Sequence, residues 1–451
     1  MELIKDGRCV EVELTDTTMT YKSRRTSCTS SVEEVDVMTL DKILSLKMEP
    51  SETNNNAGHR KQFTVCFARD VDKTNMRVDK ATFKGTEKIC DKILAQLEPL
   101  LAAKRRPKQL LVIVNPNSGR RQAKKIFHRK VEPFFQLVGI MCKVIVTERP
   151  KQAQEILQSH DLTDIDGVVT VGGDGLYCEC LSGLVMRAQK DAGIDYNDPD
   201  AEVVPSQLPI GIIPAGSGDY VVQYLHGTRD VMTAAIHIAL GKSGPVNAVS
   251  VHQERQLSAY SGLLLGFGLF GDIMNDCEKF RWMGSSRFNI IPVGTVLRRR
   301  MFDVEVEYLP DGGSEWEQTE GKLYGVDTYV ITRKPKQEKM VPCFGDNALT
   351  LFLTSKCSLA KHVQQLTKVQ DHKTGCFDYE FVDQHRVQGY RVTFPRATLT
   401  STEDGETTLA EKYYINCDGE VICLSKPQFE VRLHRNAVPL FGSVRDALQC
   451  W

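Results

Sequence analysis

The feature that most constrains the fold is a repeated pattern of strand, loop and helix between residues 109 and about 243. Four short apolar runs occupy 109–114, 143–147, 167–171 and 210–213. Nearly continuous apolar runs are typical of strands that are buried on both faces. Helical spacing of apolar residues lies between them, at 122–135 and 176–188. This alternation predicts an α/β domain, a parallel sheet with helices on both faces.

Each apolar run is followed directly by a polar or glycine-rich cluster. The clusters are Asn115-Pro116-Asn117-Ser118-Gly119, Thr147-Glu148-Arg149, Gly172-Gly173-Asp174-Gly175 and Pro214-Ala215-Gly216-Ser217-Gly218-Asp219. Ligands of open parallel sheets bind beyond the carboxyl ends of the strands. Glycines let backbone N–H groups approach anionic oxygens, and the helix that follows favours negative charge there. One glycine turn carries little information, but four such clusters in succession predict a phosphate-binding cleft.

Asp174 is unusual in such a cleft because its carboxylate repels phosphate. Two tasks suit it, which are holding Mg²⁺ or accepting the proton of an attacking hydroxyl. Positioning and charge neutralisation are nearly all that phosphoryl transfer requires. The alternative is that Asp174 only caps the helix that begins at Leu176.

The regions on either side have strand-like alternation. Residues 1–103 carry such runs at 10–14 and 62–67 and a closing amphipathic helix at 86–97, with Thr86 as its N-cap, which predicts a small β-barrel module. The basic segment 104–108 begins the next domain, either as a solvated connector or as a contact for anionic lipid. Residues 244–451 predict an antiparallel β-sandwich packed beside the α/β domain of residues 104–243. The interface of two such domains is a usual place for a ligand cleft.

Composition excludes several classes of protein. The net charge is −1, with 57 Lys and Arg against 58 Asp and Glu, so we expect no nucleic-acid partner drawn by a global field. The apolar stretch 257–270 is 14 residues long, short of the roughly 20 that span a bilayer. The first residues lack the apolar core of a signal peptide. The 14 cysteines are scattered, which favours reduced thiols in a cytoplasmic protein.

The ordered motifs resemble the diacylglycerol, sphingosine and ceramide kinase superfamily over roughly residues 109–440. The shared run is Val171-Gly172-Gly173-Asp174-Gly175-Leu176, with Asn115-Pro116 before it and Gly211-Ile212-Ile213-Pro214-Ala215-Gly216-Ser217 after it. Three later segments most resemble the ceramide kinases, namely 266–273, 278–284 and 416–421. The N-terminal module is similar to a degenerate pleckstrin-homology domain, although its closing helix lacks the tryptophan usual in that fold.

The resemblance implies roles residue by residue. Asp174 would be the general base, and Gly172, Gly173 and Gly175 would shape the lipid-headgroup and phosphate site. Asp272 and Asp276 would lie near the headgroup, or would be surface carboxylates paired with Lys279 or Arg281. The implied nucleotide-binding residues are Asn115, Pro116, Asn117, Thr147, Glu148, Arg149, Pro150, Lys151, Glu179, Gly216, Ser217, Gly218, Arg281, Arg287, Asp418, Gly419 and Glu420.

The resemblance implies transfer of the γ-phosphate of ATP, with Mg²⁺, to the primary hydroxyl of ceramide. Sphingosine and diacylglycerol remain alternative acceptors. A third possibility is a ceramide-kinase-like protein that keeps the fold without phosphorylating lipid. A lipid substrate implies peripheral contact with intracellular membranes; the sequence identifies no metal ligands and no protein partner.

Overall fold

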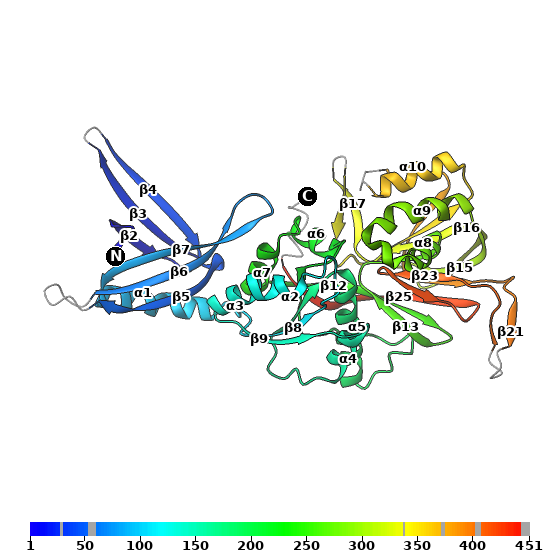
Figure 1. Cartoon of the computed structure of the whole chain (residues 1–451), viewed down its shortest axis with the longest axis horizontal. Helices are drawn as coiled ribbons and strands as arrows, with labels where there is room; N and C mark the ends of the chain where they lie inside the picture. The colour runs from blue at the N-terminus through cyan, green and yellow to red at the C-terminus, as the bar shows by residue number, and fades with distance from the viewer. Residues whose placement is uncertain (28–29, 53–59, 337–338, 371–374, 402–406, 443–451) are drawn as a thin grey trace.

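The computed structural model describes residues 1–27, 30–52, 60–336, 339–370, 375–401 and 407–442. Three parts lie in a row along the long axis, with the N-terminal part at one end and the C-terminal strands at the other (Figure 1). No helix in the described ranges is both long and apolar enough to cross a membrane.

The N-terminal part is a seven-stranded antiparallel sheet with one helix. Its elements are β1 (Glu2–Lys5), β2 (Arg8–Leu14), β3 (Thr18–Ser27), β4 (Ser30–Thr39), η1 (Leu40–Lys42), β5 (Ile43–Glu52), β6 (Arg60–Asp70), β7 (Met76–Thr86) and α1 (Glu87–Ala102). The strand order is β4-β3-β2-β1-β7-β6-β5. The apolar side of α1, including Ile93 and Leu97, is buried in one cluster with Phe63 and Phe83. Thr86 is at the N-cap position, but within the described part of the chain its side chain makes no capping hydrogen bond.

The middle part alternates strands and helices. Its elements are β8 (Gln109–Val114), α2 (Ala123–Ile126), η2 (Phe127–Val131), α3 (Glu132–Leu137), β9 (Met141–Val146), α4 (Gln152–Ser159), β10 (Gly167–Gly172), α5 (Asp174–Asp191), β11 (Ile210–Pro214), α6 (Tyr220–His226) and α7 (Val231–Leu240). The strands pair in parallel in the order β9-β8-β10-β11. After β8 the chain adds β9 on one side of it, and then crosses over to add β10 on its other side. Between β8 and β10 lies the switch point where open α/β sheets bind ligands.

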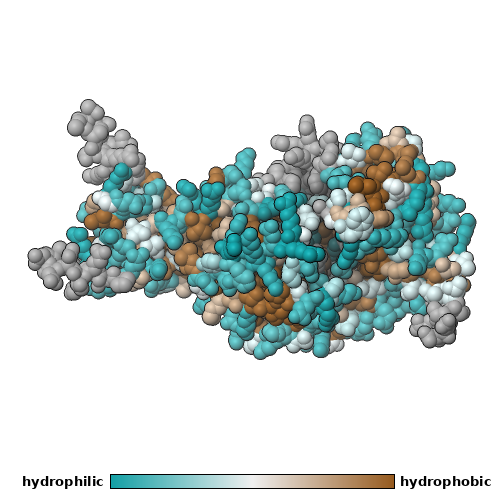
Figure 2. All heavy atoms as spheres, in the orientation of Figure 1, coloured by the Kyte–Doolittle hydropathy of each residue, from teal (hydrophilic) through white to brown (hydrophobic). Residues whose placement is uncertain are grey.

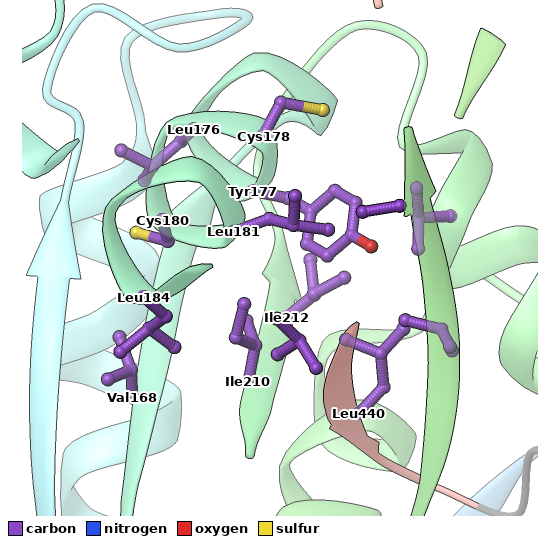
Figure 3. Packing of buried hydrophobic residues seen from close by; sticks show 14 of the residues in the cluster. Val168, Leu176, Tyr177, Cys178, Cys180, Leu181, Leu184, Ile210, Ile212 and Leu440 are labelled. Atoms are coloured by element: carbon purple, nitrogen blue, oxygen red, sulfur yellow. The ribbon is translucent and has the colours of Figure 1, made fainter. Parts of the chain in front are cut away.

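Both faces of this parallel sheet are buried. Leu111, Ile113 and Val168 face the cluster that holds α4 and α5, whereas Val112 and Val169 face the cluster that holds α3 and α7. Figure 3 shows Tyr177 and Leu181 of α5 above Ile212 of β11, and Leu184 of α5 beside Val168 of β10, in a cluster that also includes Leu440.

The C-terminal part is mainly antiparallel. Its strands are β12 (Ser243–Gln253), β13 (Gln256–Ser261), β14 (Leu264–Gly268), β15 (Phe302–Pro310), β16 (Glu317–Tyr329), β17 (Thr332–Lys336), β18 (Lys339–Cys343), β19 (Leu349–Ser355), β20 (Val382–Thr393), β21 (Leu399–Ser401), β22 (Thr407–Leu409), β23 (Tyr414–Cys417), β24 (Glu420–Cys423) and β25 (Gln428–Phe441). Its helices are α8 (Leu269–Lys279), η3 (Arg281–Ser286), α9 (Arg287–Arg298) and α10 (Leu359–Gln370). Strands β16 and β20 each pair with β15 along one half and with β19 along the other, so these four strands enclose a core.

Two features differ from the sequence-based expectation. Helices α8, α9 and α10 interrupt a region in which only strands were expected. The two sheets are also not separate, because β25 pairs with β12 and β20 and, at Ile210 and Leu440, continues the parallel sheet beside β11. The α/β part and the C-terminal strands therefore share one 14-stranded sheet.

Candidate active site

Three of the four predicted loops pack directly on one another beyond the strand ends. A Cβ on Gly216 would lie 2.5 Å from Gly173 Cα, and a Cβ on Gly119, where φ is +50°, would lie 2.6 Å from Ala215 O. The Ala215 amide donates to Gly172 O at 2.9 Å. The Asn115 side chain accepts from the Asn117 amide at 2.9 Å and so holds the first loop in a turn beside Pro116. The glycines are required because backbones meet here without room for side chains.

Asp174 is the first residue of α5 and lies where these loops converge. Its Oδ2 accepts from the Tyr220 amide and its Oδ1 from the Val221 amide, both at 3.0 Å. The carboxylate thus caps α6, the helix after the fourth loop, and not the helix it begins. Burial raises the pKa of Asp174, while the two amides oppose the rise. A Cβ on Gly218 would lie 3.2 Å from Asp174 Oδ2, so the fourth loop passes directly beside this carboxylate.

Glu179 ties the second loop to α5 in a similar way. Its carboxylate accepts from the Ala153 amide at 3.2 Å in the first turn of α4, and burial raises its pKa. Two carboxylates of one helix therefore hold the N-termini of two other helices. Lys151, with φ of +62°, is the N-cap residue of α4 and lines a cavity together with Glu179.

Of the other residues in the second loop, one is bonded to the sheet and three are exposed to solvent. Thr147 is buried, and its amide donates to Val114 O at 2.9 Å. Glu148, Arg149 and Pro150 are exposed. The Arg149 guanidinium forms a bidentate ion pair with Glu155 of α4.

The second half of the chain reaches this site through Asp418. Oδ1 of Asp418 accepts from the Ser261 hydroxyl and the Leu263 and Leu264 amides, and Oδ2 accepts from the Gly262 amide, at 2.8–3.0 Å. Burial raises the pKa of this carboxyl. Asp418 thus fixes the turn between β13 and β14, and the next residue, Gly419, has φ of +90°.

One cavity brings residues of the two halves together. Its volume is about 200 Å³, and Lys151, Gly175 and Glu179 line one wall while Asp418 and Glu420 line the other. Burial raises the pKa of Glu420, and the positive charges of Lys151 and Arg281 oppose the rise. Residues more than 230 positions apart in the sequence therefore share a cleft beside the loop junction.

The remaining predicted site residues lie in α8, η3 and α9. Arg281 and Arg287 both approach Glu278, and Arg287 Nη2 lies 3.9 Å from its Oε1. Asp272 is buried and accepts from Arg300 at 3.3 Å, and burial raises its pKa.

Asp276 pairs with Lys279 at 3.1 Å and accepts from Thr295 at 2.8 Å. Burial raises the pKa of Asp276, but these hydrogen bonds outweigh it and leave the pKa lowered. The pairing with Lys279 is the surface alternative that the sequence offered for Asp276.

Sequence reasoning missed Asp219 as a site residue. Its Oδ1 accepts from the Gly216 amide at 3.0 Å, and its backbone is left-handed with φ of +51°. Burial, together with the negative charge of Asp174, raises its pKa to about 6. The sequence did contain a signal for Asp219. It directly follows the Gly216-Ser217-Gly218 run, just as Asp174 lies within the other glycine-rich loop.

A second, smaller cavity lies between β16, β19, α8 and α10. Its volume is about 20 Å³, and its lining includes Leu269, Phe270, Asp327, His362 and Gln365. Among the described residues, Asp327 Oδ1, His362 Nδ1 and Gln365 Oε1 have no hydrogen-bond partner. Burial raises the pKa of Asp327 well above its ordinary value and lowers that of His362. The lining is thus mainly apolar, with a few buried polar groups.

The chain was compared with known proteins. The family model for the diacylglycerol kinase catalytic domain matches residues 109–251. Human ceramide kinase is 34% identical over 427 residues, which cover 79% of this chain and 78% of that protein. The chain belongs to the ceramide kinase family. It is therefore a lipid kinase, and enzymes of this family use ATP as the phosphoryl donor.

Other members of the superfamily are more distant or match a shorter stretch. Human ceramide kinase-like protein is 26% identical over 442 residues, covering 85% of this chain and 77% of that protein. Sphingosine kinase 1 of Arabidopsis thaliana is 34% identical over 214 residues, covering 47% of this chain and 41% of that protein.

The fold is that of the diacylglycerol kinases. A crystal structure of a diacylglycerol kinase from Bacillus anthracis str. Sterne matches with a TM-score of 0.51 at 17% identity, covering 75% of this chain and 98% of that one. The match thus spans nearly the whole of that kinase and three quarters of this chain.

Proposed function

We propose that this lipid kinase transfers the γ-phosphate of ATP to the primary hydroxyl of ceramide, with Asp174 as general base. The observation that carries the proposal is the place of Asp174, a half-buried carboxylate at the junction of three glycine-containing loops. Its pKa is raised by burial, so the carboxylate is a stronger base than an exposed one. Each oxygen accepts one amide and keeps a second lone pair with which to take a proton.

The nucleotide is proposed to lie along the first, second and fourth loops. Free backbone amides of these loops would receive the phosphates, because amide groups before a helix favour negative charge. Lys151 and Arg281 add positive charge beside the cleft. Glu179 and Asp418 are proposed as positioning residues, because their carboxylates hold α4 and the β13–β14 turn in place.

Magnesium is proposed as the cofactor. In the part of the chain that the structure describes, no three His, Cys, Asp or Glu side chains are grouped to hold a metal. Mg²⁺ in kinases needs only one or two carboxylates together with substrate phosphates and water. Asp219 fits that need, because burial and the charge of Asp174 raise its pKa to about 6, and a bound cation would favour its charged form. Bound there, the ion would neutralise phosphate charge.

Ceramide is proposed over sphingosine and diacylglycerol because the similarity to human ceramide kinase extends over most of the chain, whereas that to the sphingosine kinase covers about half.

The domain organisation is a proposal of the same kind. We propose a pleckstrin-homology-like module at 1–103, a nucleotide-binding domain at 104–243 and a lipid domain at 244–451. Support comes from the boundaries of the elements, since α1 ends at Ala102 and β12 begins at Ser243. The protein is proposed to be cytoplasmic and to meet its substrate by peripheral contact with intracellular membranes.

The deciding experiment is a kinase assay with labelled ATP against ceramide, sphingosine and diacylglycerol in detergent micelles. We expect labelled ceramide 1-phosphate, with the highest kcat/KM for ceramide. A higher kcat/KM for another acceptor would overturn the ceramide assignment alone. No labelled product from any acceptor would point to the ceramide-kinase-like alternative.

A further inference from the structure

Helix α9 and the turn before it expose an unusual amount of apolar side chain. Among the residues that the structure describes in α9, Thr295 is the only buried one. Ile290, Val293 and Leu297 are 57%, 60% and 58% exposed, and they share one stripe of the helix because they are three and four residues apart. Monomeric soluble proteins rarely expose a large contiguous patch of this kind without an interaction to explain it.

Further apolar side chains extend this surface. Trp282 in η3 is 81% exposed, Phe280 and Phe288 flank it at 38% and 42%, and Val363 of α10 is 47% exposed. Figure 2 shows hydrophobic atoms gathered where α9 and α10 lie in Figure 1. We call the side chains of Phe280, Trp282, Phe288, Ile290, Val293 and Leu297 the α9 patch.

Basic residues flank the α9 patch along the chain, and the side chains of Lys279, Arg281 and Arg298 are 60%, 69% and 56% exposed. Segments 272–300 and 359–370 together contain eight Lys and Arg against three Asp and Glu, a net charge of +5 in a chain of net charge −1. The acidic side chains are all engaged here, Asp272 by Arg300, Asp276 by Lys279 and Arg298, and Glu278 by Arg281. The excess of positive charge therefore lies on the same side of the molecule as the apolar stripe.

We propose that the α9 patch and its basic rim dock this lipid kinase on the surface of a bilayer that contains anionic phospholipids. A helix that exposes Trp, Phe and aliphatic residues beside Arg and Lys lies in the interface between headgroups and acyl chains. Basic residues near an anionic surface add electrostatic attraction to this apolar contact. A second copy is a poorer occupant, since a symmetric dimer would set two positive surfaces against each other.

The place of the patch fits the chemistry. α8 packs against α9 and carries Asp272 together with Leu269 and Phe270, which line the small cavity. A bilayer under α9 would thus lie beside the elements proposed to receive the lipid. The inference rests on the proposed function only in that the substrate is a membrane lipid.

The test is sedimentation with vesicles of phosphatidylcholine, with and without one quarter phosphatidylserine. We expect binding to the anionic vesicles that weakens as salt is raised, because salt screens the basic rim. The triple variant Ile290→Glu, Val293→Glu, Leu297→Glu should lose about tenfold or more in vesicle affinity. A matched control, Val71→Glu, Met141→Glu, Val204→Glu, replaces three exposed apolar residues elsewhere and should bind like the parent.

A second measurement needs no destabilising change. Trp282 is one of three tryptophans, and its emission should shift to the blue on addition of anionic vesicles, with the shift lost in Trp282→Phe. Unchanged vesicle binding of the triple variant would overturn the proposal, as would absence of binding by the parent. So would a parent dimer that the triple variant dissociates without any change in vesicle binding.

The result of the vesicle-binding test can be distinguished from the result of the test of the proposed function. Asp174→Asn should bind vesicles like the parent while losing turnover. The triple variant should phosphorylate a short-chain acceptor dispersed in detergent and lose activity only on lipid embedded in vesicles.

Discussion

Four buried or half-buried carboxylates in and around the cleft each hold backbone amides. Asp174 and Glu179 hold the first turns of α6 and α4, Asp219 holds the Gly216 amide, and Asp418 holds the β13–β14 turn. Unpaired amides at a helix start favour negative charge, so these bonds stabilise the local fold. A side chain that reacts in this site is therefore also part of what shapes it.

The first prediction concerns Asp174. Asp174→Asn should keep ATP binding but lose at least about 10²-fold in kcat, the lower range for removal of a general base. Asn retains one acceptor oxygen, so one of the two amides of α6 loses its partner and some stability is lost as well. ATP binding, kcat and thermal unfolding should be measured on the same preparation.

The control is Asp230→Asn, because Asp230 caps α7 through the Thr233 amide in a comparable way. It should lower stability by a similar amount and leave kcat near that of the parent. Equal losses of kcat in the two variants would show that Asp174 acts only as a cap.

The same residue sets a pH dependence. Burial raises the pKa of Asp174, so its proton-accepting form is lost at a higher pH than for an exposed aspartate, whose pKa is about 3.9. We expect kcat to fall with decreasing pH along a limb whose midpoint lies above that value. A midpoint at or below the ordinary aspartate pKa would contradict the assignment.

At the scale of elements, the loops are fitted to one another through glycine. The fourth loop touches the third at Gly216 and Gly173 and the first at Gly119 and Ala215. Such contacts need neighbouring strand ends, which the order β9-β8-β10-β11 supplies. The proposed phosphate site thus depends on the order of the strands rather than on any single loop.

Gly216→Ala tests this packing. The added Cβ would meet backbone at Gly173, where it cannot be relieved by a rotamer change, and overpacking costs about 1–3 kcal/mol. We expect a higher KM for ATP and a lower free energy of unfolding, measured by steady-state kinetics and urea titration. Gly321→Ala is the control, since its Cβ would meet nothing within 4 Å. An unchanged KM would show that the loop tolerates displacement.

The predictable elements were those whose signal is local. The run 109–114 coincides with β8, and the other three runs fall within one or two residues of β9, β10 and β11. α9 was missed because its apolar stripe faces solvent and is interrupted by Pro292, so it lacks the pattern of a core helix. The pairing of β25 with β11 was missed because it joins residues more than 200 positions apart.

The site residues also differ in whether their signal in the sequence is local or long-range. Asp174, the glycines and the pairing of Asp276 with Lys279 could be identified from spacing, whereas the turn held by Asp418 and the pairing of Asp272 with Arg300 depend on distant partners. Asp327 could not be identified from the sequence. Its burial becomes evident only in the structure, where Gly266 and Gly325 leave room for its carboxyl.

At the scale of the whole molecule, the N-terminal sheet and the α/β part share a core. Leu44, Cys66 and Met76 belong to the same buried cluster as Ala234 and Ala235 of α7. The Met76 amide also donates to Thr233 Oγ1 at 2.9 Å. The N-terminal sheet is therefore not a loosely tethered module.

Thr233→Val should destabilise the two parts together. It leaves the Met76 amide buried without a partner, at a cost of about 1–3 kcal/mol, and also removes a bond to Asp230. Calorimetry should show one transition at a lower temperature, and the surface change Thr163→Val should leave it in place. Two resolved transitions, with only the earlier one moved, would show that the parts unfold independently.

The position of β25 has a consequence for biosynthesis. The strand beside β11 comes from residues 428–441, so the parallel sheet stays open at that edge until nearly the whole described chain has left the ribosome. A nascent chain that already contains Asp174 and all four predicted loops still presents an unpaired strand edge, which favours association with other chains. A premature stop codon before residue 428 is therefore expected to abolish the kinase, although it lies about 250 residues downstream of Asp174.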